Sequence, residues 1–177
     1  MTPTIFIDFV GAALKLHGAS DAINDWPPGE YDMAKVLGIS PHEFWRPINY
    51  MGEAFWAEMP STRRMYALMA LVCEMDWYIA SKPRLDPACV PGKLKWLADY
   101  LNPFSEPFDR YVFTPHKHLL ASSGRILIDD SDAEIAAWHK AGGYSILWPA
   151  KWNSDHEYAD DPITRIRYNL RQIGVGP

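Results

Sequence analysis

Polar side chains stand at or just after the ends of several short apolar runs, at Asp8, Ser81, Lys117, Asp129 and Asp130. A carboxylate can attack phosphorus, a hydroxyl and an ammonium group can hold phosphate oxygens, and paired carboxylates can bind Mg²⁺. This combination favours phosphoryl transfer. The alternative is that each residue is polar only because the end of a strand is exposed to water.

These residues can act together only if the apolar runs are strands of one sheet. Short β-branched and aromatic runs predict strands at residues 4–7, 77–80, 110–113, 125–128 and 144–148. Amphipathic or capped stretches predict helices at residues 9–17, 63–74, 91–101 and 132–141. Strands that alternate with helices imply an α/β fold with a parallel sheet, whose carboxyl ends meet at one edge.

The segment between the first two predicted strands has few strand-like alternations, and we expect it to be helical. Ser40 and Glu43 form the sequence signature of a capping box, which predicts a helix beginning at Pro41. The large aromatic residues of this segment include Phe44, Trp45, Phe55 and Trp56. Such side chains either stack on a nucleobase or pack the helices against one another.

The composition excludes several classes of protein. The net charge of −5 and the pI near 5.6 argue against a nucleic-acid polymer as partner. The longest apolar runs have about half of the ~20 residues needed to cross a bilayer, so no membrane insertion is expected. The cysteines Cys73 and Cys89 make no disulfide framework, and the N-terminus has no signal-peptide pattern. We therefore expect a cytoplasmic protein.

Two segments carry a specific resemblance. Residues 113–121 read FTPHKHLLA and residues 124–130 read GRILIDD. They resemble the third and fourth motifs of 5′(3′)-deoxyribonucleotidases of the haloacid-dehalogenase (HAD) phosphatase superfamily. Ser81 and the residues after it, through Gly92 and Lys93, are similar to the second motif and the helix that follows it.

The resemblance implies a fold and an activity. The fold would be a HAD-like Rossmann-type parallel sheet flanked by helices, formed by residues 1–8 and 63–177, with a small helical cap at residues 9–62 inserted after the first strand. The activity would be Mg²⁺-dependent hydrolysis of (deoxy)ribonucleoside monophosphates through an aspartyl-phosphate. Phe44, Trp45, Phe55 and Trp56 would then lie in the cap, where they could bind the nucleotide.

The same resemblance assigns roles to the polar residues. Ser81 would hold the phosphate and Lys117 would neutralise its charge, while Asp8, Asp129 and Asp130 would form the magnesium site. Asp8 would also be the nucleophile. An exposed lysine contributes little to stability, so replacing Lys117 is expected to weaken phosphate binding and leave the fold intact.

The first motif departs from the family pattern, D-x-D-G-V followed by a later aspartate. Here Ile7-Asp8 runs directly into Phe9-Val10. Asp8 is therefore either the nucleophile or the later aspartate, which would cap the next helix. In both cases the second aspartate, the general acid and base, has no counterpart, because Val10 cannot transfer a proton. We expect impaired catalysis.

Three readings of this departure stay open. The chain is an impaired phosphatase, or a catalytically inactive protein that binds nucleotides or a protein partner, or the natural protein carries residues that this sequence lacks. The sequence also leaves open the base and sugar preference and whether the chain forms a homodimer.

Overall fold

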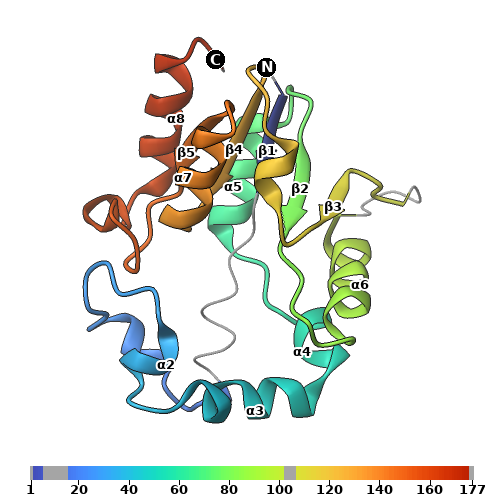
Figure 1. Cartoon of the computed structure of the whole chain (residues 1–177), viewed down its shortest axis with the longest axis vertical. Coiled ribbons are helices and arrows are strands. Elements are labelled where there is room, and N and C mark those ends of the chain that lie inside the picture. Colours follow the sequence, from blue (N-terminus) through green and yellow to red (C-terminus); the bar gives the residue numbers. More distant parts are fainter. Residues whose placement is uncertain (1, 6–15, 102–106, 176–177) are drawn as a thin grey trace.

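The computed structural model describes residues 2–5, 16–101 and 107–175, and it contains a parallel five-stranded sheet. The strand order is β3-β2-β1-β4-β5, with β1 in the centre (Figure 1). The strands are β1 (Thr2–Ile5), β2 (Tyr78–Ser81), β3 (Tyr111–Phe113), β4 (Arg125–Asp129) and β5 (Tyr144–Leu147). The predicted α/β fold with a parallel sheet is therefore confirmed.

The register brings two of the predicted site residues to the same edge of the sheet. Ile5 of β1 pairs with Ile79 of β2 on one side and with Ile128 of β4 on the other. Ser81 and Asp129 are the last residues of β2 and β4, just beyond those pairs. Both therefore lie at the carboxyl edge, where α/β folds place their ligands.

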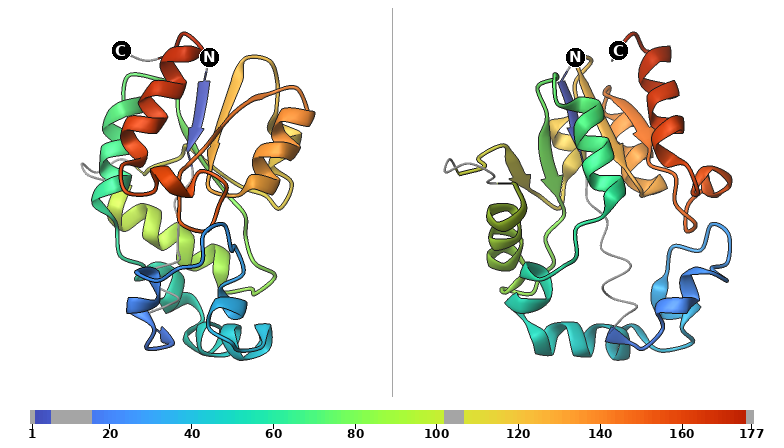
Figure 2. Two further views of the ribbon diagram at one scale, coloured as in Figure 1. Left: turned by 90° about the vertical axis from the view of Figure 1, so that its left-hand side faces the viewer. Right: turned by 180° about the vertical axis from the view of Figure 1, so that it is seen from behind.

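Helices cover both faces of the sheet. Helices α5 (Arg63–Val72) and α8 (Pro162–Gln172) lie on one face and α7 (Asp132–Lys140) lies on the other (Figure 2). Alternating residues of β4 point to opposite faces, and Ile126 and Ile128 pack with Leu68 of α5 and Ile166 of α8. Burial of apolar surface between the sheet and these helices stabilises the sheet that carries the site.

The segment between β1 and β2 is helical where it is described. Helices α2 (Met33–Val36), α3 (Pro41–Met51) and α4 (Glu53–Ala57) lie beyond the carboxyl ends of the strands (Figure 1). The predicted capping box begins α3: the Ser40 hydroxyl accepts the backbone N–H of Glu43, and the Glu43 carboxylate accepts the backbone N–H of Ser40. The division into a core and a cap stays a prediction.

The remaining regular elements are short or lie in the second half of the chain. Helix α6 (Cys89–Leu101) follows β2, and the 3₁₀ turns are η1 (Ser20–Ile23), η2 (Lys117–Leu120) and η3 (His156–Tyr158). In the part of the chain that the structure describes, no helix is both long and apolar enough to span a bilayer.

The observed bounds differ from the expected ones in a few places. Strand β4 continues to Asp129, because the Asp129 carbonyl accepts the backbone N–H of Trp148 at 2.7 Å and extends the ladder to β5. Helix α8 was not expected, although Asp161 caps it and Pro162 occupies its first turn. Most residues of α8 are polar, and only a narrow stripe of Pro162, Ile166 and Leu170 is buried. The helix expected at residues 9–17 falls largely outside the described residues.

A close contact between α6 and α4 makes Gly92 sensitive to substitution. A Cβ on Gly92 would lie 2.5 Å from the backbone oxygen of Glu53 and 2.6 Å from Cβ of Trp56. Because the Glu53 oxygen belongs to the backbone of a helix, the two helices would have to separate. We expect Gly92→Ala to lower the free energy of unfolding by about 1–3 kcal/mol, measured by urea denaturation. Gly124→Ala is the matched control, because a Cβ there meets no atom within 4 Å; an equal effect of both would contradict the packing argument.

Candidate functional site

A cavity of about 840 Å³ is lined by residues at the carboxyl edge of the sheet and by residues of the helices α2 to α4. From the sheet side it is lined by residues at the ends of β2 and β4 and by η2. From the helical side it is lined by large aromatic and aliphatic side chains. The predicted site residues on its wall are Ser81, Lys117, Asp129, Asp130, Trp45, Phe55 and Trp56. The structure thus gathers in one cavity most of the residues that the sequence singled out.

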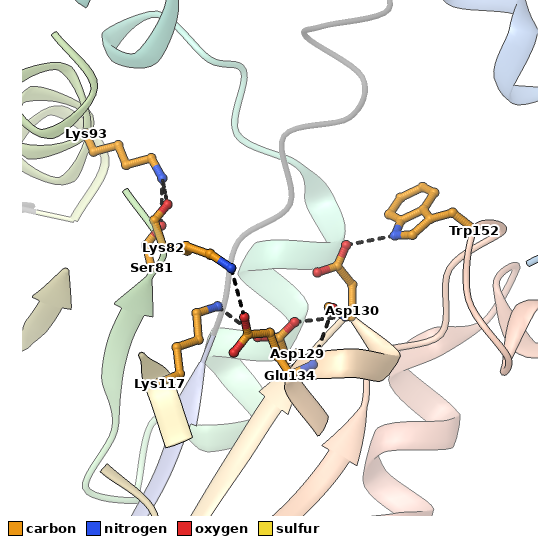
Figure 3. Close-up of polar contacts among 9 residues, drawn as sticks. Ser81, Lys82, Lys93, Lys117, Asp129, Asp130, Glu134 and Trp152 are labelled. Carbon is orange, nitrogen blue, oxygen red and sulfur yellow. Dashed lines mark hydrogen bonds and ion pairs between the residues drawn. The ribbon is translucent and has the colours of Figure 1, made fainter. Parts of the chain in front are cut away.

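Lys117 and Asp129 form an ion pair in the cavity wall (Figure 3). The Lys117 Nζ donates to Asp129 Oδ2 at 2.8 Å, and the two side chains are 7% and 2% exposed. Burial lowers the pKa of Lys117, and the negative charge of Asp129 opposes that shift. The other carboxylate oxygen of Asp129 accepts the backbone N–H of Ser131 at 2.8 Å.

The burial of Lys117 corrects the expectation of an exposed lysine. The error arose because η2 folds back under the carboxyl edge, where the lysine meets a carboxylate, and this long-range contact leaves no trace in the local sequence. Removing Lys117 would therefore leave the Asp129 carboxylate buried without its counter-ion, and this is expected to destabilise the fold.

Ser81 is held by a lysine that sequence analysis did not place in the site. The Lys93 Nζ donates to Ser81 Oγ at 2.8 Å and to the backbone carbonyl of Lys82 at 3.0 Å (Figure 3). Lys93 is 5% exposed. Burial lowers its pKa to about 8, with the thiol of Cys89 opposing the shift and the charge of Lys117 adding to it.

A sequence signal for Lys93 existed. The residue lies four positions after Cys89 and three before Trp96 on α6, and both of these side chains are buried. A lysine on the apolar stripe of a helix must either reach water or find a polar partner. Here it finds Ser81.

Asp130 is held by the loop that follows β5. The indole Nε1 of Trp152 donates to Asp130 Oδ2 at 2.8 Å, and the side-chain amide of Asn153 donates to the Asp130 carbonyl at 2.9 Å. Trp152 also contacts Trp26 edge to face, with ring centroids 6.2 Å apart. Through Trp152, this loop links the Asp130 carboxylate to Trp26 in the segment that precedes α2. The local sequence around Asp130 does not indicate this contact.

The predicted nucleotide-binding aromatics divide into two groups. Trp45, Phe55 and Trp56 line the cavity, whereas Phe44 is 1% exposed and packs in the core, stacked on His17. Phe44 is absent from the cavity wall and belongs to the buried core, so its role is to pack the helix rather than to contact a ligand. The guanidinium of Arg84, from the loop after β2, lies 3.5 Å above the ring of Trp45.

The charges of the cavity wall are arranged by sign. Ammonium groups gather on the side of β2, α6 and η2, and carboxylates gather at the end of β4 and the start of α7 (Figure 3). Lys82 spans the two sides, because its Nζ lies 3.3 Å from Glu134 Oε1. The cationic side suits an anion, and the acidic side suits a cation beside it.

The wall offers oxygen ligands of the kind that Mg²⁺ prefers. Among residues 2–5, 16–101 and 107–175, no group of three or more His, Cys, Asp or Glu side chains is placed to hold a metal ion. Mg²⁺ commonly needs only one or two carboxylates, with water and substrate phosphate completing its shell. Asp129 and Asp130, adjacent in sequence and both on the cavity wall, fit that requirement. Asp8, the other predicted ligand and predicted nucleophile, lies outside the described residues.

Comparison with known proteins adds no assignment: no family model matches the chain, and no curated protein matches it. The function must therefore be argued from the site itself.

Proposed function

We propose that this protein is a phosphohydrolase of the HAD type, whose substrates are (deoxy)ribonucleoside monophosphates. The observation that carries the proposal is the meeting of Ser81, Lys93, Lys117 and the Asp129–Asp130 pair on one wall of a cavity with an aromatic opposite wall. A phosphate monoester needs hydroxyl and ammonium donors for its oxygens, and a nucleoside needs a flat apolar surface.

On the cationic side, the chain's own groups can bind and orient the phosphate. Ser81 can donate its hydroxyl hydrogen to a phosphate oxygen, while Lys93 holds the oxygen of that hydroxyl in place. Lys117 is held by Asp129 and brings a positive charge to the same wall. Asp129 and Asp130 would hold Mg²⁺, which offsets the charge of the phosphate when bound.

On the opposite side, the nucleoside would lie among the side chains of α3 and α4. Trp45, Phe55 and Trp56 supply aromatic surface, and a volume of about 840 Å³ falls in the range of small-molecule sites. The ligand would be a small nucleotide rather than a nucleic-acid polymer. We propose a cytoplasmic location for the protein.

Catalysis by the present chain would be slow. By resemblance the nucleophile is Asp8. In the family an aspartate two positions later acts as general acid and base, and here that position is Val10, which cannot transfer a proton. Binding does not depend on that residue. A nucleotide-binding protein without turnover is therefore the second candidate.

Binding measurements test the proposal directly. In calorimetric titrations with Mg²⁺, we expect deoxyribonucleoside monophosphates to bind and the corresponding deoxyribonucleosides to bind more weakly. Ser81→Ala removes a hydrogen bond to a charged group, so affinity for the monophosphate should fall about 10- to 150-fold. Ser123→Ala, at an exposed serine before β4, is the matched control and should bind as the parent does. Equal affinity for nucleosides and monophosphates would contradict a phosphate site at Ser81.

A further inference from the structure

The contact between Ser81 and Lys93 has the form of a nucleophile with its base. Nucleophilic serines are activated by a basic side chain within hydrogen-bond reach, and that base is in turn oriented by a third group. Here the Ser81 Oγ and the Lys93 Nζ are 2.8 Å apart, and the carbonyl of Lys82 fixes the ammonium group at 3.0 Å. Both side chains line the cavity, so a ligand can reach the hydroxyl.

The surroundings of Lys93 favour its neutral form. The side chain is enclosed by α4, α6 and the end of β2, and its Nζ lies 5.1 Å from the ring centroid of Trp56. Among the described residues, the thiol group of Cys89 on its own helix raises the pKa of Lys93 and the charge of Lys117 on η2 lowers it. Burial is the largest influence and brings the pKa to about 8, so a substantial share of Lys93 is an unprotonated amine in mildly alkaline solution.

We propose that Ser81 and Lys93 form a serine–lysine dyad, in which Ser81 attacks the carbonyl carbon of small carboxylic esters and Lys93 is its general base. The cavity suits such substrates, since Ile48, Phe55 and Trp56 give it an apolar wall for an acyl or alkyl group. This activity goes beyond the proposed phosphatase and does not rest on it, because it uses neither Asp8 nor a metal ion.

The chemistry balances within these groups. The neutral amine of Lys93 takes the hydroxyl proton as Ser81 Oγ bonds to the carbonyl carbon. The tetrahedral intermediate then expels the alkoxide, which takes that proton from the Lys93 ammonium and leaves as an alcohol. Water attacks the acyl-serine with Lys93 again as base, and this releases the carboxylic acid and restores Ser81.

A serine-directed reagent tests the dyad without a known substrate. The full chain is incubated with an alkyl fluorophosphonate, which forms a bond from Oγ to phosphorus and releases fluoride, and the product is mapped by peptide mass spectrometry. We expect one adduct, on Ser81, and a labelling rate that rises with pH through about 8 as Lys93 loses its proton. Release of p-nitrophenol from p-nitrophenyl butyrate should follow the same pH profile.

Lys93→Arg is the decisive variant, because arginine keeps a positive charge and hydrogen-bond donors and cannot serve as a base. We expect labelling of Ser81 to slow by about 10²–10⁴-fold in this variant. Ser81→Ala should abolish the adduct, and circular dichroism shows whether each variant is folded. If Lys93→Arg does not fold, the pH profile of the parent decides. No adduct on Ser81 at pH 9, a rate independent of pH, or unchanged labelling of folded Lys93→Arg would each overturn the dyad. Nucleotide binding by the unlabelled parent chain reports separately on the proposed phosphatase.

Discussion

Replacing Lys117 by alanine is expected to lower the free energy of unfolding by about 3–5 kcal/mol, because it leaves the carboxylate of Asp129 buried without its partner. Asp129 is 2% exposed, and its Oδ2 accepts the Lys117 ammonium at 2.8 Å. The hydrogen bond from Ser131 to Oδ1 remains, but one neutral donor does not replace an ion pair. Urea denaturation monitored by tryptophan fluorescence measures the change.

A double variant separates the effect of the buried charge from the effect of losing the lysine side chain. In Lys117→Met with Asp129→Asn both charges are gone, so the double variant should cost less than the sum of its two single variants. Lys82→Ala is the matched control, since Lys82 is exposed and its pair with the partly buried Glu134 should contribute at most about 1 kcal/mol. A small effect of Lys117→Ala, similar to that of Lys82→Ala, would mean that the charge of Asp129 is already satisfied by other contacts.

This buried pair also limits how the phosphate site can be tested. A lysine that holds a carboxylate in place contributes to folding and to ligand binding, so loss of binding in a Lys117 variant does not identify a phosphate ligand. Ser81 is a cleaner probe, because removing its hydroxyl leaves the buried Lys93 ammonium with another hydrogen-bond acceptor. The remaining Lys93 ammonium still reaches the carbonyl of Lys82.

The sheet could be predicted from the sequence because its signals are local. Each β-strand is a short apolar run, and the helices between them begin with recognisable caps, as at Ser40 and at Ser131. Parallel strands place their carboxyl ends together, so the meeting of Ser81 and Asp129 followed from the alternation of strands and helices. Asp8 belongs to the same argument but lies outside the described residues.

The site's contacts could not be predicted in the same way, because they join residues far apart in the chain. Trp152 reaches Asp130 across 22 positions of sequence, and Arg84 covers Trp45 from a different element. Lys93 is the exception, since its place on a buried helical stripe was visible. The sequence could not show that the partner of this lysine is the Ser81 hydroxyl.

Phe44 shows the converse error. It was grouped with Trp45, Phe55 and Trp56 because all four are aromatic and belong to one helical segment. Adjacent residues on a helix point about 100° apart, so one of them can face a ligand while the other packs in the core. The structure directs Trp45 to the cavity and Phe44 to the core. The helical period alone would not have separated them, because the adjacent residues Phe55 and Trp56 of α4 both line the cavity.

Inserting D-x-D-G-V and its following residues after Ile7 is expected to raise phosphate release from deoxyribonucleoside monophosphates by about 10²–10⁴-fold, the usual contribution of general acid–base catalysis. Cleavage of the ester needs a proton for the leaving alkoxide, and the attack of water on the aspartyl-phosphate needs a base. One aspartate performs both steps in the family that this sequence resembles, and Val10 can perform neither. Phosphate release with Mg²⁺ is measured for the parent and the lengthened chain.

The matched control for that insertion has the same length and carries asparagine in place of both aspartates. It should bind nucleotide and release no phosphate above the parent, because asparagine neither attacks phosphorus nor transfers a proton. Rapid turnover by the parent would contradict the prediction and would mean that another carboxylate, Asp130 or Asp132, transfers the proton. Each of these is already engaged, Asp130 by the Trp152 indole and Asp132 by the backbone N–H of Ser154 at 3.1 Å, so either would have to release its partner first. If the parent and lengthened chains bind nucleotide and neither hydrolyses it, the cavity carboxylates take part in binding only. The protein is then a nucleotide-binding protein without turnover.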